Sequence, residues 1–130
     1  MGRRGARRGE KTATEKVLSD LRRGEVWLAD LDPIRGHEQA GRRPVLVVSD
    51  DLFNNGPAEL VIVLPMTSNL RPIASRVLAS PPEGGLKQPS MILCEGIRSL
   101  SRQRLVGRWG TVSRVTLAAV EQRLRMLLRL

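Results

Sequence analysis

A short stretch ahead of the first long apolar segment gathers side chains that can transfer protons and bind anions. Residues 36–44 read GHEQAGRRP and hold the only histidine of the chain, His37, next to Glu38 and shortly before Arg42 and Arg43. Imidazole, with an unperturbed pKa of about 6.5, suits proton transfer at neutral pH. A carboxylate can serve as a base, and the planar fork of arginine fits phosphate and carboxylate groups. This combination exceeds what a loop that only joins two strands requires.

The composition supports an anionic partner. The formal net charge is +9, and arginine outnumbers lysine 19 to 3. The positive charge is concentrated in residues 1–23 and 98–129. A nucleic acid, an acidic protein, or both would be attracted to such a surface. Judged from the charge alone, a solvated basic surface without a partner explains the composition equally well.

Length and cysteine content narrow the class of protein. A chain of 130 residues fits one domain. No apolar run approaches the roughly 18 residues that would suggest a membrane span, and no apolar segment follows the N-terminal arginines as it would in a secretory signal. The single cysteine, Cys94, excludes an internal disulfide and a multi-cysteine zinc site. We therefore expect a cytoplasmic protein without a membrane segment.

Short strands and one helix must position the reactive stretch. Leu117, Val120, Leu124 and Leu127 recur at helical spacing after a possible cap at Ser113, and they predict a C-terminal helix with core or dimer contacts. Apolar runs and period-two alternation predict strands at 24–31, 44–49, 59–68, 74–80, 90–95 and 104–110. The expected fold is α+β and mainly β: a small antiparallel sheet or open barrel closed by the helix.

The N-terminal region has a different character. Residues 1–13 are rich in arginine and glycine and predict a disordered arm. Residues 12–23 could form one short helix. We therefore divide the chain into a basic extension, residues 1–21, and one domain, residues 22–130.

Several spaced motifs resemble one known family. The segment RRGEVWLADLDPIRGHEQAGRRPVLVVSDDLFNNGPAELVIVLPMTS resembles the N-terminal half of MazF/PemK/Kid toxin endoribonucleases. It has the basic-Gly-Glu-apolar-Trp start, then DP, the pattern G-[SH]-E-Q, an RP that opens an apolar strand, and P-apolar-T-S. The later segments LKQPSMILCEGIRSL and RLVGRWGTVS also match, so the resemblance covers residues 22–130.

The resemblance implies both fold and function. The family has a compact SH3-like barrel with helices, shared with the gyrase-poisoning CcdB toxins, and forms homodimers. Its activity is sequence-selective cleavage of single-stranded RNA without a metal ion or cofactor, and an acidic antitoxin covers the active groove. Cleavage of this kind uses the 2′-OH as nucleophile and leaves a 2′,3′-cyclic phosphate and a 5′-OH end.

The resemblance also assigns site residues. Arg43 would stabilise the phosphorane or donate a proton, and the Thr67 hydroxyl would bind a phosphate oxygen or merely close its own turn. Glu38 is the candidate base, with a loop-bracing role as the alternative, and His37 could act in its place or only contact RNA. The catalytic residues predicted are thus Arg43, Thr67 and Glu38. The predicted RNA-binding residues are Arg35, His37, Gln39, Ser68, Asn69, Glu95 and Arg98.

One position departs from the family pattern. The Kid branch carries an Arg-x-Asp pair where this chain has Leu93 and Glu95. This difference shifts the catalytic burden to Arg43 and Thr67, and leaves Glu95 to bind RNA or to hold Arg98. Between them, Cys94 is expected to be a core thiol. The two tryptophans, Trp27 and Trp109, are expected in the core or an interface rather than as stacking platforms.

Two other functions remain open from the sequence. A non-catalytic toxin of the same fold could bind gyrase as CcdB does, and a basic module could bind nucleic acid without cleaving it. Neither would need Arg43 and Thr67 together.

Overall fold

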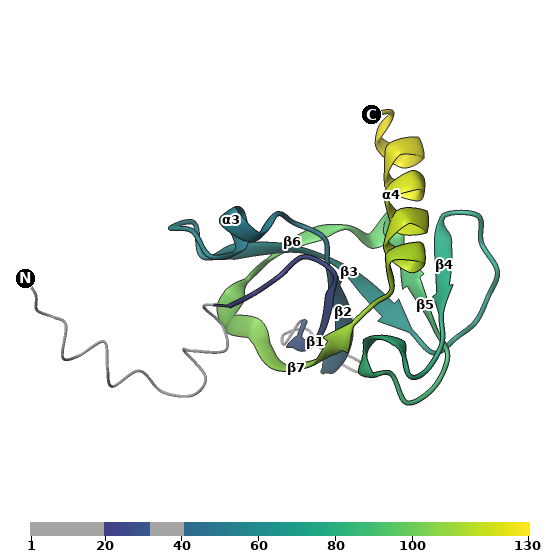
Figure 1. Ribbon diagram of the computed structural model, residues 1–130, viewed down its shortest axis with the longest axis horizontal. Coiled ribbons are helices and arrows are strands. Elements are labelled where there is room, and N and C mark those ends of the chain that lie inside the picture. Colours follow the sequence, from purple (N-terminus) through teal and green to yellow (C-terminus); the bar gives the residue numbers. More distant parts are fainter. Residues whose placement is uncertain (1–19, 32–40) are drawn as a thin grey trace, which may run out of the picture.

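A computed structural model describes residues 20–31 and 41–130 of the chain. Figure 1 shows a curved sheet with a long C-terminal helix standing against one side. The strands are β1 (Glu25–Asp30), β2 (Arg42–Val47), β3 (Leu60–Thr67), β4 (Arg76–Ala79), β5 (Ser90–Leu93), β6 (Arg98–Ser101) and β7 (Leu105–Thr111). The helices are α3 (Asp51–Asn54) and α4 (Arg114–Leu128), with 3₁₀ turns η1 (Glu83–Gly85), η2 (Cys94–Gly96) and η3 (Arg102–Arg104).

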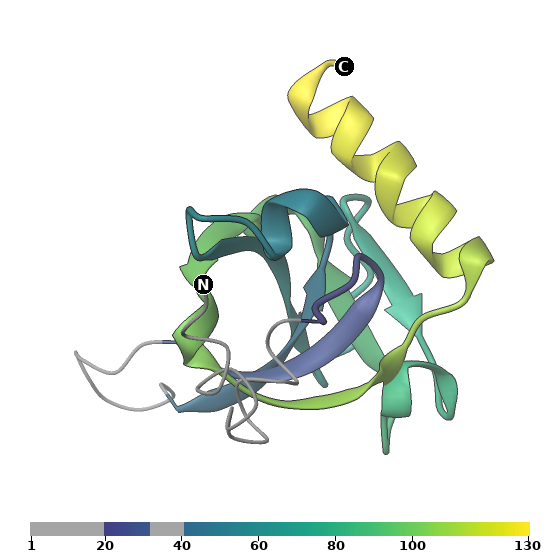
Figure 2. The ribbon, with the colours of Figure 1, turned by 60° about the vertical axis from the view of Figure 1, so that its left-hand side comes forward.

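The sheet is antiparallel and open. Its order is β4-β5-β3-β2-β1-β7, with β6 also paired to β3. The long β3 pairs with β6 over its first half and with β5 at its end, and the sheet curls strongly as a result (Figure 2). β4 and β7 lie at opposite ends of the pairing order, so the strands of the described residues do not close into a barrel. The predicted mainly β architecture with a C-terminal helix is confirmed.

Period-two alternation builds two cores from the same strands. Val26 and Leu46 face one core, where Val120 of α4 is also buried. Trp27 follows Val26 in β1, and Val45 precedes Leu46 in β2. Both of these neighbours face the second core. Successive side chains of a strand point to opposite faces, so a continuous apolar run predicts burial on both. The strands predicted at 24–31 and 44–49 are therefore confirmed.

The C-terminal helix begins where its cap predicts. The Ser113 hydroxyl accepts a hydrogen bond from the backbone N–H of Thr116 at 3.1 Å, which satisfies one of the free amides of the first turn. Val120 is buried and Leu124 packs against the core, whereas Leu127 is 45% exposed and does not join it. Among the described helices, none combines the length and apolarity needed to cross a bilayer.

The N-terminal border differs from the predicted short helix. Residues 20–23, the described part of that segment, are not helical. Leu21 is nevertheless fully buried, and its backbone N–H donates to the side-chain oxygen of Asn55 at 3.2 Å. The rest of the predicted helix and the predicted arm lie outside the described residues, so the division of the chain after residue 21 stays a prediction.

Candidate active site

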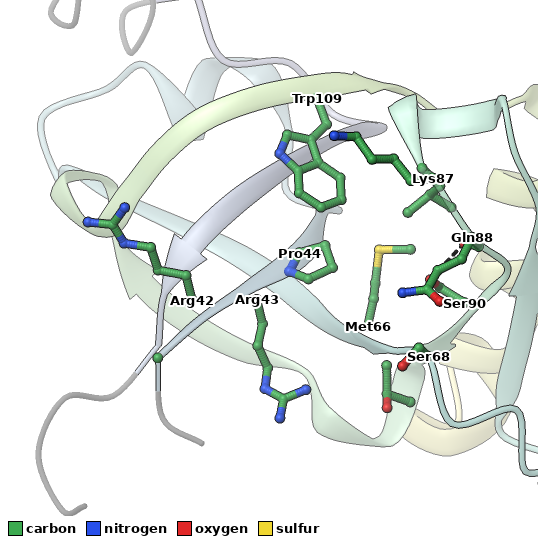
Figure 3. A pocket seen from close by; sticks show the side chains of 12 residues that line it. Arg42, Arg43, Pro44, Met66, Ser68, Lys87, Gln88, Ser90 and Trp109 are labelled. Atoms are coloured by element: carbon green, nitrogen blue, oxygen red, sulfur yellow. Dashed lines mark hydrogen bonds between the residues drawn. The ribbon is translucent and has the colours of Figure 1, made fainter. Parts of the chain in front are cut away.

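A cavity of about 520 Å³ opens where the ends of β2 and β3 meet the loop before β5. In Figure 3, Arg43 and Ser68 lie along one edge, Trp109 and Lys87 along the opposite edge, and Pro44 and Met66 between them. Its lining consists of Gly41, Arg42, Arg43, Pro44, Met66, Thr67, Ser68, Leu86, Lys87, Gln88, Ser90 and Trp109.

The strands β2 and β3 bring the two principal candidates to one cavity. β2 and β3 pair as far as Val45 and Pro65. Beyond this pair, Arg43 lies near the start of β2 and Thr67 ends β3. Arg43 is half-buried and Thr67 likewise, and both line the cavity. A guanidinium and a hydroxyl are thus held by rigid strands at one rim, a suitable arrangement for binding a phosphate.

The Thr67 hydroxyl has a local role as well. Its oxygen accepts a hydrogen bond from the backbone N–H of Asn69 at 3.1 Å, which closes the turn after β3. The hydroxyl hydrogen remains available to donate, because accepting a bond uses only a lone pair. Ser68 lines the cavity, whereas Asn69 does not. Both readings of Thr67 are therefore compatible with its geometry.

The opposite wall contains residues that the sequence did not single out. Trp109, Lys87, Gln88 and Ser90 all line the cavity. Trp27 is 1% exposed, which confirms its expected place in the core. Trp109 is 38% exposed, so a core position is wrong for it and the expected interface role stays a prediction. Lys87, Gln88 and Ser90 belong to the matched segment LKQPSMILCEGIRSL, which could have indicated them.

A glycine turn holds this wall in place. Gly85 has a φ of +69°, and a Cβ there would lie 2.1 Å from the carbonyl oxygen of Trp109. Only glycine accommodates both the left-handed backbone and such a close approach. The turn η1 therefore packs directly on the backbone of β7 and fixes Trp109 relative to the loop that carries Lys87.

Glu95 lies in a different contact from the expected one. Its carboxylate accepts hydrogen bonds from Arg76 Nε at 2.7 Å and from the Ser75 hydroxyl at 2.6 Å. In the part of the chain that the structure describes, its ion-pair partner is Arg76 and not Arg98, so the expected Glu95–Arg98 contact is wrong. Partial burial raises the pKa of Glu95, but the hydrogen bonds from Ser75 and Arg76 outweigh it and hold this pKa below its ordinary value. Neither Glu95 nor Arg98 lines the cavity.

Three acidic side chains of the described residues pair with arginines away from the cavity. Besides Glu95, Glu25 pairs with Arg108 at 2.8 Å and Glu121 pairs with Arg23 at 2.6 Å. Among the described residues that line the cavity, Arg42, Arg43 and Lys87 are cationic and none is acidic. This distribution leaves the cavity positive and suited to a polyanion.

Four predicted site residues, Arg35, His37, Glu38 and Gln39, lie outside the described residues. The base of the proposed reaction therefore stays a prediction. Within residues 20–31 and 41–130, no group of three His, Cys, Asp or Glu side chains could hold a metal ion.

Cys94 is fully buried in the core that faces α4. Desolvation, followed by the charge of Glu95, raises the pKa of this thiol to about 11. A thiol with so high a pKa is protonated at neutral pH and is a poor nucleophile. The predicted role of Cys94 as a core residue is confirmed.

Comparison with known proteins identifies the family. Residues 22–128 match the family described as the PemK-like, MazF-like toxin of type II toxin-antitoxin systems. Endoribonuclease MazF9 of Mycobacterium tuberculosis is 38% identical over 111 residues, which cover 82% of this chain and 94% of the relative. MazF from Deinococcus radiodurans has a similar structure, with a TM-score of 0.72 at 30% identity, covering 85% of this chain and 97% of that one. A MazE–MazF structure from the same organism gives a TM-score of 0.72 at 28% identity, covering 85% and 98%. The chain therefore belongs to the PemK-like, MazF-like toxins of type II toxin–antitoxin systems.

Proposed function

We propose that this protein is the toxin of a type II toxin–antitoxin system and acts as an endoribonuclease on single-stranded RNA. The observation that carries the proposal is the presence of Arg43 and Thr67 in the lining of one cavity that also holds Arg42 and Lys87. Family membership supports the same activity, and so does the 38% sequence identity with an endoribonuclease, which extends over 94% of that relative. Cleavage of RNA in the cytoplasm would inhibit translation.

The proposed reaction is an internal transfer. The 2′-OH attacks the adjacent phosphorus, the bond to the 5′-oxygen breaks, and the products are a 2′,3′-cyclic phosphate and a 5′-OH end. Arg43 would stabilise the negative charge that develops on the phosphorane, and the Thr67 hydroxyl would donate to one of its oxygens. Glu38 or His37 would take the proton of the 2′-OH. Because the nucleophile is part of the substrate, positioning supplies much of the rate.

The proposal includes two protein partners. An acidic antitoxin would bind the basic face around the cavity, since opposite charges attract and the family is defined by such pairs. A second copy of the chain is the other partner, giving a homodimer. Leu78 and Leu70 are exposed apolar residues that such an interface could cover. Light scattering after gel filtration would measure the molar mass and so distinguish a homodimer from a monomer.

The decisive experiment incubates the purified protein with a long RNA in EDTA. We expect discrete fragments whose 5′ ends can be labelled by a kinase without prior phosphatase treatment. An Arg43→Ala protein purified in parallel excludes a contaminating nuclease. Intact RNA with shifted mobility would instead indicate a basic binding module. Intact and unshifted RNA, with inhibition of gyrase, would indicate a toxin that acts as CcdB does.

A further inference from the structure

Trp109 has an unusual position for a large aromatic side chain. The chain has only two tryptophans, one phenylalanine and no tyrosine. Trp27 is buried, where an indole contributes most to stability, but Trp109 lies on the end strand β7 and remains 38% exposed. Figure 3 shows its indole directed over the cavity that Arg43 and Thr67 border. An exposed aromatic ring beside a cationic cavity is accessible to a ligand that enters the cavity.

The backbone that carries the indole is held in a fixed position. The carbonyl of Trp109 packs against Gly85, and Gly110 packs closely against the same turn, since a Cβ on Gly110 would lie only 2.7 Å from the backbone nitrogen of Gly85. The backbone on either side of the indole therefore cannot shift without moving η1. Preorganised aromatic rings bind ligands with little loss of conformational freedom.

A cation lies at the same edge. Lys87 lines the cavity together with Trp109, and in Figure 3 its side chain extends toward the same edge as the indole. A flat apolar ring next to an ammonium group is the combination that binds one nucleotide of a single strand: the ring stacks on the base and the cation contacts the phosphate. Arg43 and Ser68 lie across the cavity from this pair.

We propose that Trp109 stacks on a base next to the scissile phosphate and that Lys87 contacts the phosphate of that nucleotide. This inference rests on the proposed endoribonuclease function and adds a second contact point for the substrate, opposite the Arg43–Thr67 rim. Every base offers a π-face, so stacking on Trp109 increases affinity more than it selects sequence. The binding energy is gained before and during the reaction alike, so its loss raises KM and leaves kcat nearly unchanged.

Fluorescence tests the contact directly, because Trp27 is buried and Trp109 is the exposed emitter. The probe is an oligonucleotide that carries the cleavage motif mapped on long RNA, with 2′-O-methyl riboses throughout so that the nucleophile is absent and the strand stays intact. We expect this oligonucleotide to quench tryptophan emission in the unaltered protein and not in Trp109→Leu. Trp109→Leu should weaken binding roughly 5- to 150-fold, and Trp109→Phe, which keeps an aromatic face, should restore much of it.

An abasic scan locates the stacked base. Bases are removed from the oligonucleotide one at a time, and the affinity of each product is measured for both proteins. At one position, loss of the base should weaken binding to the unaltered protein but not to Trp109→Leu, as expected when the base and the indole act through one contact. Lys87→Met should reduce the log–log salt dependence of binding by about 0.7. Circular dichroism confirms that each variant is folded.

The outcomes separate this inference from the proposed function. If the protein cleaves RNA through Arg43 but Trp109 emission does not respond and Trp109→Leu binds as tightly as the unaltered protein, the contact is wrong and the nuclease stands. If Trp109→Leu lowers kcat with KM unchanged, the indole acts in the chemical step and the stacking role is wrong. If Trp109→Leu abolishes dimer formation instead, the indole belongs to a protein interface and the inference is overturned. Absence of any cleavage overturns the proposed function and this inference with it.

Discussion

Removal of the Arg43 guanidinium should separate chemistry from binding. Arg43 lies near the start of β2 just before Pro44, where β2 pairs with β1, and it lines the cavity together with Thr67. Its backbone therefore has little freedom to move away from the phosphate that we place there. Arg43→Ala removes a preorganised donor from the charge that develops on the phosphorane. Loss of one such donor typically lowers kcat by roughly 10²–10³, equivalent to about 3–4 kcal/mol of transition-state stabilisation.

The expected effect on affinity is much smaller. One lost phosphate contact should reduce the log–log salt dependence of binding by about 0.7 for a single strand. Lys87 and Arg42 remain at the cavity, and the fold should be unaffected because Arg43 is only half-buried. The assay measures single-turnover cleavage of a short RNA that carries the mapped motif, with the concentration of enzyme varied. This design gives the rate of the chemical step and the affinity separately.

Arg42 provides the matched control. It precedes Arg43 in the same strand and carries the same charge, but it is exposed, and Figure 3 shows its side chain leaving the strand in a different direction from that of Arg43. Arg42→Ala should reduce affinity slightly and leave the rate of cleavage within a few-fold. Equal loss of rate in both variants would mean that only the general positive charge matters. Cleavage by Arg43→Ala within a few-fold of the unaltered protein, or a pure increase in KM, would refute the catalytic assignment.

The same geometry predicts four further outcomes. Thr67→Val should lower kcat, though less than Arg43→Ala, and Thr67→Ser should restore it, because serine can both accept from Asn69 and donate to phosphate; melting temperatures exclude a mere loss of the turn. Cleavage should persist in EDTA, and loss of activity that Mg²⁺ restores would contradict the proposed mechanism. Glu95 has a depressed pKa in the folded protein, so its contribution to stability should be present above its unfolded pKa of about 4.3 and be lost as the pH falls through its folded pKa. Glu95→Gln should therefore reduce the fall in melting temperature at acidic pH. An equal fall in the variant and the unaltered protein would contradict this role of Glu95. Cys94 should resist thiol reagents at pH 8 and react fully in denaturant, since its pKa is raised to about 11.

The sequence predicts the elements that have local signals. Apolar alternation predicted the strand at 24–31, and in β1 the neighbours Val26 and Trp27 join different cores. Ser113 and the helical spacing after it located the start of α4. These features depend on the period of the side chains and on one cap, so no knowledge of the rest of the fold is needed.

The elements that escaped prediction depend on distant partners. β6 has the sequence RSLS, in which only Leu100 is apolar, and it exists because β3 supplies a hydrogen-bonding edge, with Leu100 opposite Val61. The predicted strand 90–95 ends early, since the chain turns into η2, where Gly96 passes so close to Pro65 that a Cβ on it would lie 3.2 Å from the proline ring. Tertiary contacts of this kind leave no periodic signal in the sequence.

The candidate site likewise contains residues that the sequence marks and residues that only the fold reveals. Arg43 and Thr67 could be found because a motif marks each of them, and the pairing of β2 with β3 then explains why two residues 24 positions apart along the chain line one cavity. Trp109 could not, because an aromatic residue in an apolar strand is usually buried. Its exposure follows from the position of β7 at the end of the sheet, where one side of the strand has no neighbour among the described strands to cover it.

The missing arginine at position 93 has a structural counterpart. β4 and β5 pair Arg76 with Leu93, so a guanidinium reaches Glu95 from the neighbouring strand rather than from two residues earlier in the same strand. The Arg76 side chain is only 18% exposed, and both partners are already engaged with each other. A neutralised pair of this kind offers little charge to a phosphate and instead ties η2 to β4. The cavity keeps cations of its own, and among them Arg43 lines it together with Thr67.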